Sequence, residues 1–345
     1  MEPSVLLLSS PDDEGIRDVQ KKIVASGVPT LLVDTSSPFN SPDFSIRITP
    51  QAESVQIVGK DFVFDCSQLR SIWLRSVNCL SFRLAEKHGL TEAESHFLIN
   101  DYIEFLCGAL RVLGTRTFVL NSPDRSMSSA RKMWQLQTAA TLGFIIPRTL
   151  GTKNFGELMR WLASEKIERV AVKTSRIGGY WTLEDGKEVL NRIYTSVFSL
   201  EELELERESI GTVSATYQEY IAKKIELRVT VVGDEVFSCA IDNQNSSNPN
   251  VREDWRLVDA DSEMRCYEYP LPVHIKERCI NLVRLCNLHF GCIDFILTPE
   301  GEFVFLEINA SGEWLWIKRW DAALAEKISA ALANLLVNPP PHISP

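Results

Sequence analysis

Two carboxylates and an amide near the C-terminus have the spacing of a metal site. An apolar segment interrupted at residues 299–302 predicts a β-hairpin in which Asp294 lies directly opposite Glu307, with Cβ atoms ~5 Å apart. Asn309 lies on the same face, two residues beyond Glu307. Like charges that face each other on apolar strands destabilise a sheet, and a Mg²⁺ ion bound by these oxygens would offset the repulsion. Alternatively, both acids point to solvent on a half-exposed hairpin.

Basic residues that precede this hairpin in the chain could neutralise phosphate groups. Lys173 ends an apolar strand pattern and comes shortly before the pair Gly178-Gly179, which could close over a phosphate. Lys132 lies in a helix pattern, and Arg228 and Arg256 each offer a guanidinium, whose rigid fork matches phosphoryl oxygens. For each of these residues taken alone, an exposed position at the surface is the simpler interpretation.

Other kinds of chemistry lack a matching pattern. The chain contains no G-x-x-x-x-G-K-[ST], G-x-G-x-x-G, H-E-x-x-H or G-x-S-x-G motif. Its five histidines form no pair with metal-ligand spacing, and its eight cysteines form no C-x-x-C pair. We therefore expect neither a serine triad nor a zinc site, and we interpret the cysteines as small core residues.

The composition is that of a folded protein and limits its partners. The 345 residues are 45% hydrophobic and 24% charged, which allows two or three domains and excludes a disordered chain. The net charge of −10 argues against nucleic acid as the main partner. No segment approaches the ~20 apolar residues of a membrane helix, and the first residues lack the basic flank of a signal peptide. We expect a cytoplasmic protein that binds neither nucleic acid nor membrane.

A mixed α/β fold is expected to position these residues. Strand and helix patterns alternate over the first ~120 residues, as in a small α/β domain, and two hairpin patterns follow in the C-terminal third. Gly233-Asp234 is the predicted turn of the first hairpin, and the acidic run 200–208 is interpreted as a solvated helix face. The predicted strands are 5–8, 30–34, 72–74, 118–120, 170–174, 216–221, 227–232, 236–241, 293–298 and 303–308, and the predicted helices are 16–26, 92–113, 128–142 and 275–287.

In chain order, these features resemble the ATP-grasp superfamily over most of the sequence. The motifs that carry the resemblance are Asn121-Ser122-Pro123, Lys132 in its helix, 143–149, Ala171-Val172-Lys173, 217–221, 226–234, and the set Asp294, Glu307 and Asn309. The resemblance implies an α/β (α+β) ATP-grasp fold, in which an N-terminal α/β domain precedes central and C-terminal α+β subdomains that enclose the nucleotide. The implied boundaries are 1–122, 123–210 and 211–335.

The same resemblance implies ATP and Mg²⁺ as cofactors and gives roles to the candidate residues. The implied nucleotide contacts are Lys132, Lys173, Gly178, Gly179, Gln218, Glu219, Tyr220, Ile221 and Glu226. The two lysines would contact phosphates, the glycines would cover them, and main-chain groups of residues 218–221 would hold adenine. The implied metal ligands are Asp294, Glu307 and Asn309.

The C-terminal motifs narrow the resemblance to the microviridin-type (graspetide) macrocyclases. Residues 305–309 and 312–317, which read Phe-Leu-Glu-Ile-Asn and Gly-Glu-Trp-Leu-Trp-Ile, are similar to that family, as is Ile72-Trp73-Leu74-Arg75. Those ligases join acidic side chains of a ribosomal precursor peptide to Ser, Thr or Lys side chains. The chain departs from the family at three places. Residues 310–313 are Ala-Ser-Gly-Glu where Pro-Asn-Gly-Gln is usual, Lys318 replaces an acidic residue, and Glu226 replaces an aspartate.

The resemblance therefore implies an ATP-dependent carboxylate ligase whose partner is a precursor peptide with a leader and an acidic core. A peptide carboxylate becomes an acyl phosphate, and a hydroxyl or amine of the same peptide displaces phosphate. Arg228 and Arg256 are the catalytic candidates that would hold the acyl phosphate. A homodimer is allowed. Two alternatives stay open: a ligase that appends an amino acid to a peptide or small acid, and a non-catalytic nucleotide-binding partner that delivers a peptide to another enzyme.

Overall fold

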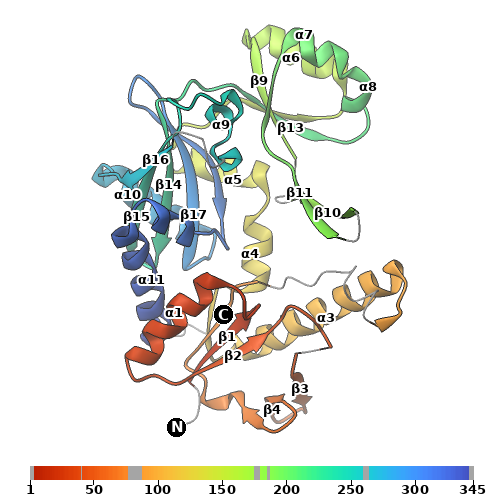
Figure 1. Cartoon of the computed structure of the whole chain (residues 1–345), viewed down its shortest axis with the longest axis vertical. Helices are drawn as coiled ribbons and strands as arrows, with labels where there is room; N and C mark the ends of the chain where they lie inside the picture. The colour runs from red at the N-terminus through yellow and green to blue at the C-terminus, as the bar shows by residue number, and fades with distance from the viewer. Residues whose placement is uncertain are drawn as a thin grey trace.

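The chain forms an N-terminal α/β unit, a central sheet and a C-terminal five-stranded sheet, which Figure 1 shows as separate groups of elements. The computed structural model describes residues 4–39, 41–76, 88–174, 179–184, 187–258 and 264–341. Gly178, which is predicted to cover the phosphates, lies outside these residues. Within these ranges, no helix has the length and apolar character that a bilayer crossing requires.

The N-terminal unit is built on a parallel sheet with the strand order β2-β1-β6-β7. Its main elements are β1 (Val5–Ser9), α1 (Glu14–Ala25), β2 (Thr30–Asp34), β6 (Ser71–Leu74), α3 (Glu92–Leu113) and β7 (Phe118–Leu120). A small antiparallel sheet and a 3₁₀ turn lie beside it: β3 (Asp43–Ile48), β4 (Glu53–Val58), β5 (Val63–Asp65) and η1 (Cys66–Gln68). Because side chains alternate along a strand, Val5 and Leu7 pack with α1, whereas Leu6 and Leu8 pack with α3.

The central sheet has the order β12-β9-β13-β8 and is antiparallel. Its elements are β8 (Thr149–Thr152), α6 (Phe155–Glu165), β9 (Arg169–Lys173), β12 (Ser196–Ser199), α7 (Leu200–Leu205), α8 (Arg207–Ile210) and β13 (Ala215–Glu219). A hairpin of β10 (Gly179–Glu184) and β11 (Lys187–Arg192) projects from it, and in Figure 1 this hairpin lies between the central sheet and α3.

The C-terminal sheet is antiparallel, with the order β16-β15-β14-β17-β18. Its strands are β14 (Ile225–Val232), β15 (Glu235–Asp242), β16 (Arg265–Glu268), β17 (Phe290–Leu297) and β18 (Phe303–Asn309). Around them lie α9 (Pro249–Glu253), η2 (Trp255–Leu257), α10 (Val273–Leu285), η3 (Leu315–Arg319) and α11 (Ala322–Val337). One face is apolar, with Leu227 and Val229 packed against α10, and the opposite face carries Arg228. We call the face with Arg228 the polar face; Val232 and Phe290 on it pack in the cluster that includes α11, and it has the side chains that the sequence singles out.

The predicted helix over 128–142 is instead two helices, α4 (Pro123–Ser129) and α5 (Lys132–Thr141). Arg131 between them has an extended backbone (φ −78°, ψ 100°) and makes no side-chain cap. Ser128, where the predicted helix begins, lies in the last turn of α4, and its Oγ donates to the carbonyl of Arg125 at 3.1 Å. The break places Lys132 in the first turn of α5.

Other predicted elements agree with the structure to different degrees. The strands at 30–34 and 118–120 and the helix at 92–113 have the predicted bounds, and Val232 pairs with Glu235 across the predicted Gly233-Asp234 turn. Gly233 adopts φ +58°, which favours glycine. The strand predicted at 216–221 ends at Glu219, so Tyr220 and Ile221 follow it. The sequence analysis assigned no strands to β3–β5, β8, β10–β12 and β16.

Candidate active site

The facing carboxylates are present, and a β-bulge brings them together. Asp294 pairs with Glu307 as predicted, whereas the next residue, Phe295, pairs with Phe305, which leaves Leu306 as an extra residue in β18. The turn is also one residue shorter than predicted, because the Thr298 amide donates to the carbonyl of Glu302. Continued without a bulge, this pairing would place Asp294 opposite Leu306. Bulges of this kind re-aim side chains beside active sites.

Asn309 completes a cluster of three oxygen-bearing side chains. Its Nδ2 lies 3.3 Å from Asp294 Oδ2 and 3.4 Å from Glu307 Oε1. Burial is the main reason that the pKa of Asp294 rises to about 6, and the charge of Glu307 adds to the rise while Arg228 opposes it. Carboxylate and amide oxygens are the hard donors that Mg²⁺ binds, and turning the Asn309 amide over would present its Oδ1, in place of Nδ2, to a cation that offsets this repulsion. The donor set therefore fits a magnesium ion.

Lysines from two different elements approach the same carboxylates. Lys132 Nζ donates a hydrogen bond to Glu307 Oε2. Although burial raises the pKa of Glu307, attraction to Lys132 and Lys173 outweighs it and holds that pKa below its usual range. Lys173, at the end of β9, has its own pKa lowered, first by burial and then by repulsion from Lys132 and Arg256. Because Lys173 interacts electrostatically with Glu307 and Asp294, the central sheet contributes to the site.

Arg228 is held against Asp294 on the neighbouring strand. Its Nη1 lies 3.0 Å from Asp294 Oδ1 and 3.1 Å from Oδ2, and these two residues are register partners in β14 and β17. Only 8% of Arg228 is exposed, and its Nε has no hydrogen-bond partner in the part of the chain that the structure describes. Trp255 covers the guanidinium, with its ring centroid 6.0 Å from Cζ. The Nε donor is therefore buried without a protein acceptor among the described residues.

Asp254 holds Arg256, a relation to which the sequence analysis gave no role. Arg256 Nε and Nη2 donate to the two Asp254 oxygens at 2.8 and 2.5 Å, and Asp254 is 4% exposed. Burial lowers the pKa of Arg256, but its bonds to Asp254 and the charges of Glu307 and Asp294 raise that pKa by more. The pKa of Arg256 therefore lies above its ordinary value. Arg256 is therefore a fixed cation near the acidic cluster. The spacing Asp-x-Arg in the sequence is the signal that could have identified the pair.

In residues 218–221, which are predicted to hold adenine, the side chains of Gln218, Glu219 and Tyr220 contact other parts of the protein. Gln218 is 3% exposed and its Nε2 donates to Thr149 Oγ1 at 3.1 Å. The carboxylate of Glu219 accepts from the Arg148 amide at 2.8 Å and from Arg148 Nε at 2.6 Å. The ring of Tyr220 lies 4.0 Å from the guanidinium of Arg169. These side chains are therefore engaged within the protein, and the predicted contact of this segment with adenine through its main chain stays a prediction.

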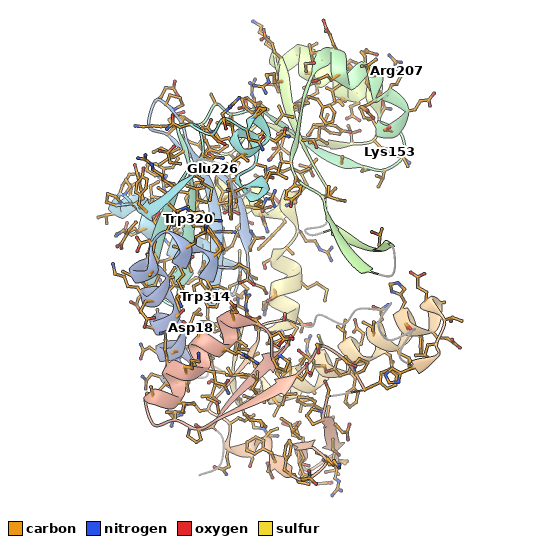
Figure 2. All side chains as sticks on the ribbon, in the orientation of Figure 1. Asp18, Lys153, Arg207, Glu226, Trp314 and Trp320 are labelled. Carbon is orange, nitrogen blue, oxygen red and sulfur yellow. The ribbon has the colours of Figure 1, made fainter. Side chains whose placement is uncertain are left out.

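Glu226 lies between this segment and the acidic cluster. It is on the same face of β14 as Arg228, and its Oε1 accepts from Lys223 Nζ at 2.8 Å and Asn243 Nδ2 at 3.2 Å. Figure 2 shows Glu226 in the upper part of the view, well away from Trp314. Gly179, the described member of the predicted glycine pair, begins β10. The predicted residues thus extend from this segment, past Glu226, to the acidic cluster.

Asn121 is a further residue whose structural role the sequence analysis missed. The sequence analysis used it only as part of the motif Asn121-Ser122-Pro123, but it is 5% exposed and all parts of its amide are bonded. Its Nδ2 donates to the carbonyls of Phe290 and Ala310 at 2.7 and 2.9 Å, and its Oδ1 accepts from the His289 amide at 2.8 Å. Asn121 therefore ties the start of α4 to both strands of the acidic hairpin.

The fold and this site define the class of the protein, an ATP-grasp ligase. No protein-family model and no curated protein sequence matches the chain. Among solved structures, the chain is similar to a Chryseobacterium gregarium RiPP-associated ATP-grasp ligase in complex with ADP and a leader and core peptide. The identity is 25% and the TM-score 0.83, with 99% of this chain and 98% of that chain covered. Here RiPP denotes a ribosomally synthesised and post-translationally modified peptide.

Two Microcystis aeruginosa MRC macrocyclases are also similar to the chain. Macrocyclase MdnC, bound with precursor peptide MdnA, is 26% identical with a TM-score of 0.79, over 97% of this chain and 99% of that one. Macrocyclase MdnB is 26% identical with a TM-score of 0.68, over 97% of this chain and 100% of that one. The predicted ATP-grasp fold, the enzyme class and the resemblance to peptide macrocyclases are confirmed.

Proposed function

We propose that this chain is an ATP-dependent ligase that activates a side-chain carboxylate of a precursor peptide and joins it to a hydroxyl or amine of the same peptide. The observation that carries the proposal is the charge arrangement on the polar face of the C-terminal sheet. Lys132, Lys173, Arg228 and Arg256 surround the pair Asp294 and Glu307, although the whole chain has a net charge of −10. A local excess of positive charge suits a polyphosphate and a carboxylate.

The peptide as substrate is supported by the two most similar structures reported above. The Chryseobacterium gregarium ligase is in complex with a leader and core peptide, and MdnC is bound with the precursor peptide MdnA. ATP as the phosphoryl donor is supported by the ADP in the first of these complexes. Both structures match almost the whole of this chain. We extend the same substrate class to this protein.

Each cationic side chain has a part in the proposed reaction. Lys132 and Lys173 bind the phosphates of ATP and neutralise charge as the γ-phosphoryl group moves to the peptide carboxylate, with ADP as the leaving group. Arg228 and Arg256 hold the acyl phosphate, because a guanidinium presents paired donors to phosphoryl oxygens. The hydroxyl or amine then attacks the acyl carbon, phosphate leaves, and the nucleophile loses its proton. Hairpin β10/β11, which begins at Gly179, excludes water from the intermediate.

A magnesium ion would be held by Asp294, Glu307 and Asn309. When bound, it would supply positive charge that offsets the charge of the phosphates. The hydrogen bond from Lys132 to Glu307 and the ion pair from Arg228 to Asp294 favour the ionised forms of these carboxylates and orient them in the protein itself. The main chain of residues 219–221 would position adenine, and Glu226 the ribose.

The proposal is tested by mass spectrometry of an acidic peptide encoded beside the gene, after incubation with the protein, ATP and Mg²⁺. We expect the loss of one water for each link, with ADP formed in proportion. A gain equal to an amino-acid residue would instead identify a ligase that appends an amino acid. Unchanged peptides with no ADP, over the set of neighbouring acidic peptides, would overturn the proposal.

A further inference from the structure

Gln135 is a fully buried amide whose three hydrogen bonds all go to the main chain. It lies in α5, three residues after Lys132, and none of its surface is exposed. Its Nε2 donates to the carbonyl of Ile308 at 2.8 Å, and its Oε1 accepts from the amide of Ile308 at 3.2 Å. Nε2 also donates to the carbonyl of Ser129 at 2.6 Å. The side chain thus pairs with Ile308 as a neighbouring strand would.

Ile308 is the residue between two of the predicted metal ligands. It lies in β18, which is an edge strand, so the main-chain groups on its outer side have no strand to pair with. The side chain of Ile308 is 1% exposed and packs in the core, whereas Glu307 and Asn309 point to the other face. Fixing the main chain of Ile308 therefore fixes the direction of both flanking side chains.

The bulge in β18 makes the hydrogen bonds between Gln135 and Ile308 more important. Leu306 is the extra residue, and the pairing of Asp294 with Glu307 exists only because the register shifts there. A slip of one residue would turn Glu307 to the opposite face. Gln135 forms hydrogen bonds with the main chain of Ile308, two residues after the bulge, and Lys132 of the same helix binds the Glu307 side chain. One helix therefore holds both the main chain and a carboxylate of this segment.

We propose that Gln135 is a positioning residue that sets Glu307 and Asn309 in the geometry needed to bind Mg²⁺. The inference rests on the proposed function of this site. It differs from a purely structural role, because the bonded atoms of Ile308 are directly joined to both ligand-bearing residues. Residues that orient metal ligands in this way are worth about 10- to 100-fold in metal affinity when they are removed.

The test uses Gln135→Met, which keeps the length and volume of the side chain and removes its hydrogen bonds. The readout is the Mg²⁺ concentration that gives half-maximal ADP binding, measured by calorimetry on the full chain without peptide. We expect this concentration to rise about 10- to 100-fold, and we expect kcat at saturating Mg²⁺ to change much less. A rise of less than about two-fold would overturn the proposal.

Ser71→Ala is the matched control. Ser71 is fully buried in β6, and its Oγ donates to the carbonyl of Leu336 at 2.6 Å, so this variant also leaves a buried carbonyl unpaired. It should lower the melting temperature and leave the Mg²⁺ requirement of ADP binding unchanged. If Ser71→Ala raised that requirement as much as Gln135→Met, a general loss of stability would explain both, and the proposal would fail. If the wild type shows no Mg²⁺-dependent ADP binding, the proposed function itself fails.

Hydrogen exchange keeps the inference testable if Gln135→Met does not fold. In the wild type, the Ile308 amide should exchange slowly, because Gln135 Oε1 accepts from it in a buried environment. The Ile308 amide should also be as well protected without ligand as with Mg²⁺ and ADP. Rapid exchange of this amide in the ligand-free protein would show that the bond is not formed, and the proposal would then be wrong.

Discussion

Strands β1 and β17 are both interior strands of their sheets, and their burial differs at one position. Every residue of β1 is buried, and four of its five residues are apolar. β17 is buried at all of its eight positions except Asp294. A carboxylate in such a strand opposes stability unless other groups compensate for its charge. The N-terminal sheet is therefore packed as a scaffold, whereas the C-terminal sheet gives up part of its packing to hold charged side chains.

The compensation around β17 comes from distant parts of the chain. Lys132 begins α5, Lys173 ends a strand of the central sheet, and Arg228 lies on the adjacent strand. Around β1 the corresponding positions are taken by apolar side chains of α1, α3 and α11. Substitutions in the two regions should therefore separate activity from stability.

The largest effect is expected from Glu307→Gln. This change keeps the shape of the side chain but removes the charge that would bind the cation and that pairs with Lys132. We expect turnover to fall by at least about 10²-fold, because the site then stabilises transferring charge poorly. ADP release with peptide present measures the loss, and thermal unfolding should show that the protein stays folded.

The control for this change lies in the same hairpin. Glu300 is exposed in the turn, and Glu300→Gln should leave ADP release within about two-fold of the wild type. Near-normal activity of Glu307→Gln would contradict the metal assignment and would remove the functional difference between the two sheets.

The opposite result is expected from Leu7→Ala in β1. Leu7 is fully buried between the N-terminal sheet and α1, so the shortened side chain leaves a cavity. We expect the free energy of unfolding to fall by about 2–5 kcal/mol, measured by urea denaturation. Activity per folded molecule should stay the same. Leu285→Ala on the exposed side of α10 is the control, and a Leu7→Ala enzyme that is folded but inactive would show that β1 shapes the site directly.

The sequence predicted those parts of the site that depend on local pattern. Alternation and a turn signal placed Asp294 opposite Glu307, and an apolar strand ending in Lys173 was recognised as β9. The bulge at Leu306 could not be predicted, because no residue in β18 marks it. Its effect happened to cancel the error of one residue in the predicted turn.

What the sequence could not predict are the contacts between segments far apart in the chain. Gln135 and Ile308 are 173 residues apart, and neither has a pattern that indicates the other. The break at Arg131 was missed because the apolar spacing continues through it. The hairpin β10/β11 was also missed, although the pair Asp185-Gly186 between its strands in the sequence is a hairpin signal. At Gln135 and Arg131, in contrast, tertiary partners decide the structure.

The smallest effect is expected where the N-terminal scaffold meets the segment after β18. Arg75 Nη2 donates to Glu313 Oε1, and the Glu313 side chain is 62% exposed. Arg75 itself is 3% exposed, but Glu313→Gln keeps an oxygen that can accept the same bond, and the carboxylate of Asp13 remains 3.7 Å from Arg75 Nε. Arg75 also retains the carbonyl of Ser311 at 2.7 Å and the ring of Trp314. We therefore expect urea denaturation of Glu313→Gln to show a loss of less than about 1 kcal/mol.

Glu313→Gln also restores the residue that is more frequent in the macrocyclases that the chain resembles. If residue 313 belongs to the scaffold, the product masses and the rate of ADP release should be those of the wild type. A change in the number of links, or a fall in rate of about ten-fold that urea denaturation does not account for, would place Glu313 in contact with the peptide. The boundary between scaffold and site would then include the junction at Arg75. We expect the first outcome, because Glu313 is mostly exposed and Arg75 keeps its buried bonds. The substitution therefore removes no buried partner from the cluster around Asp294.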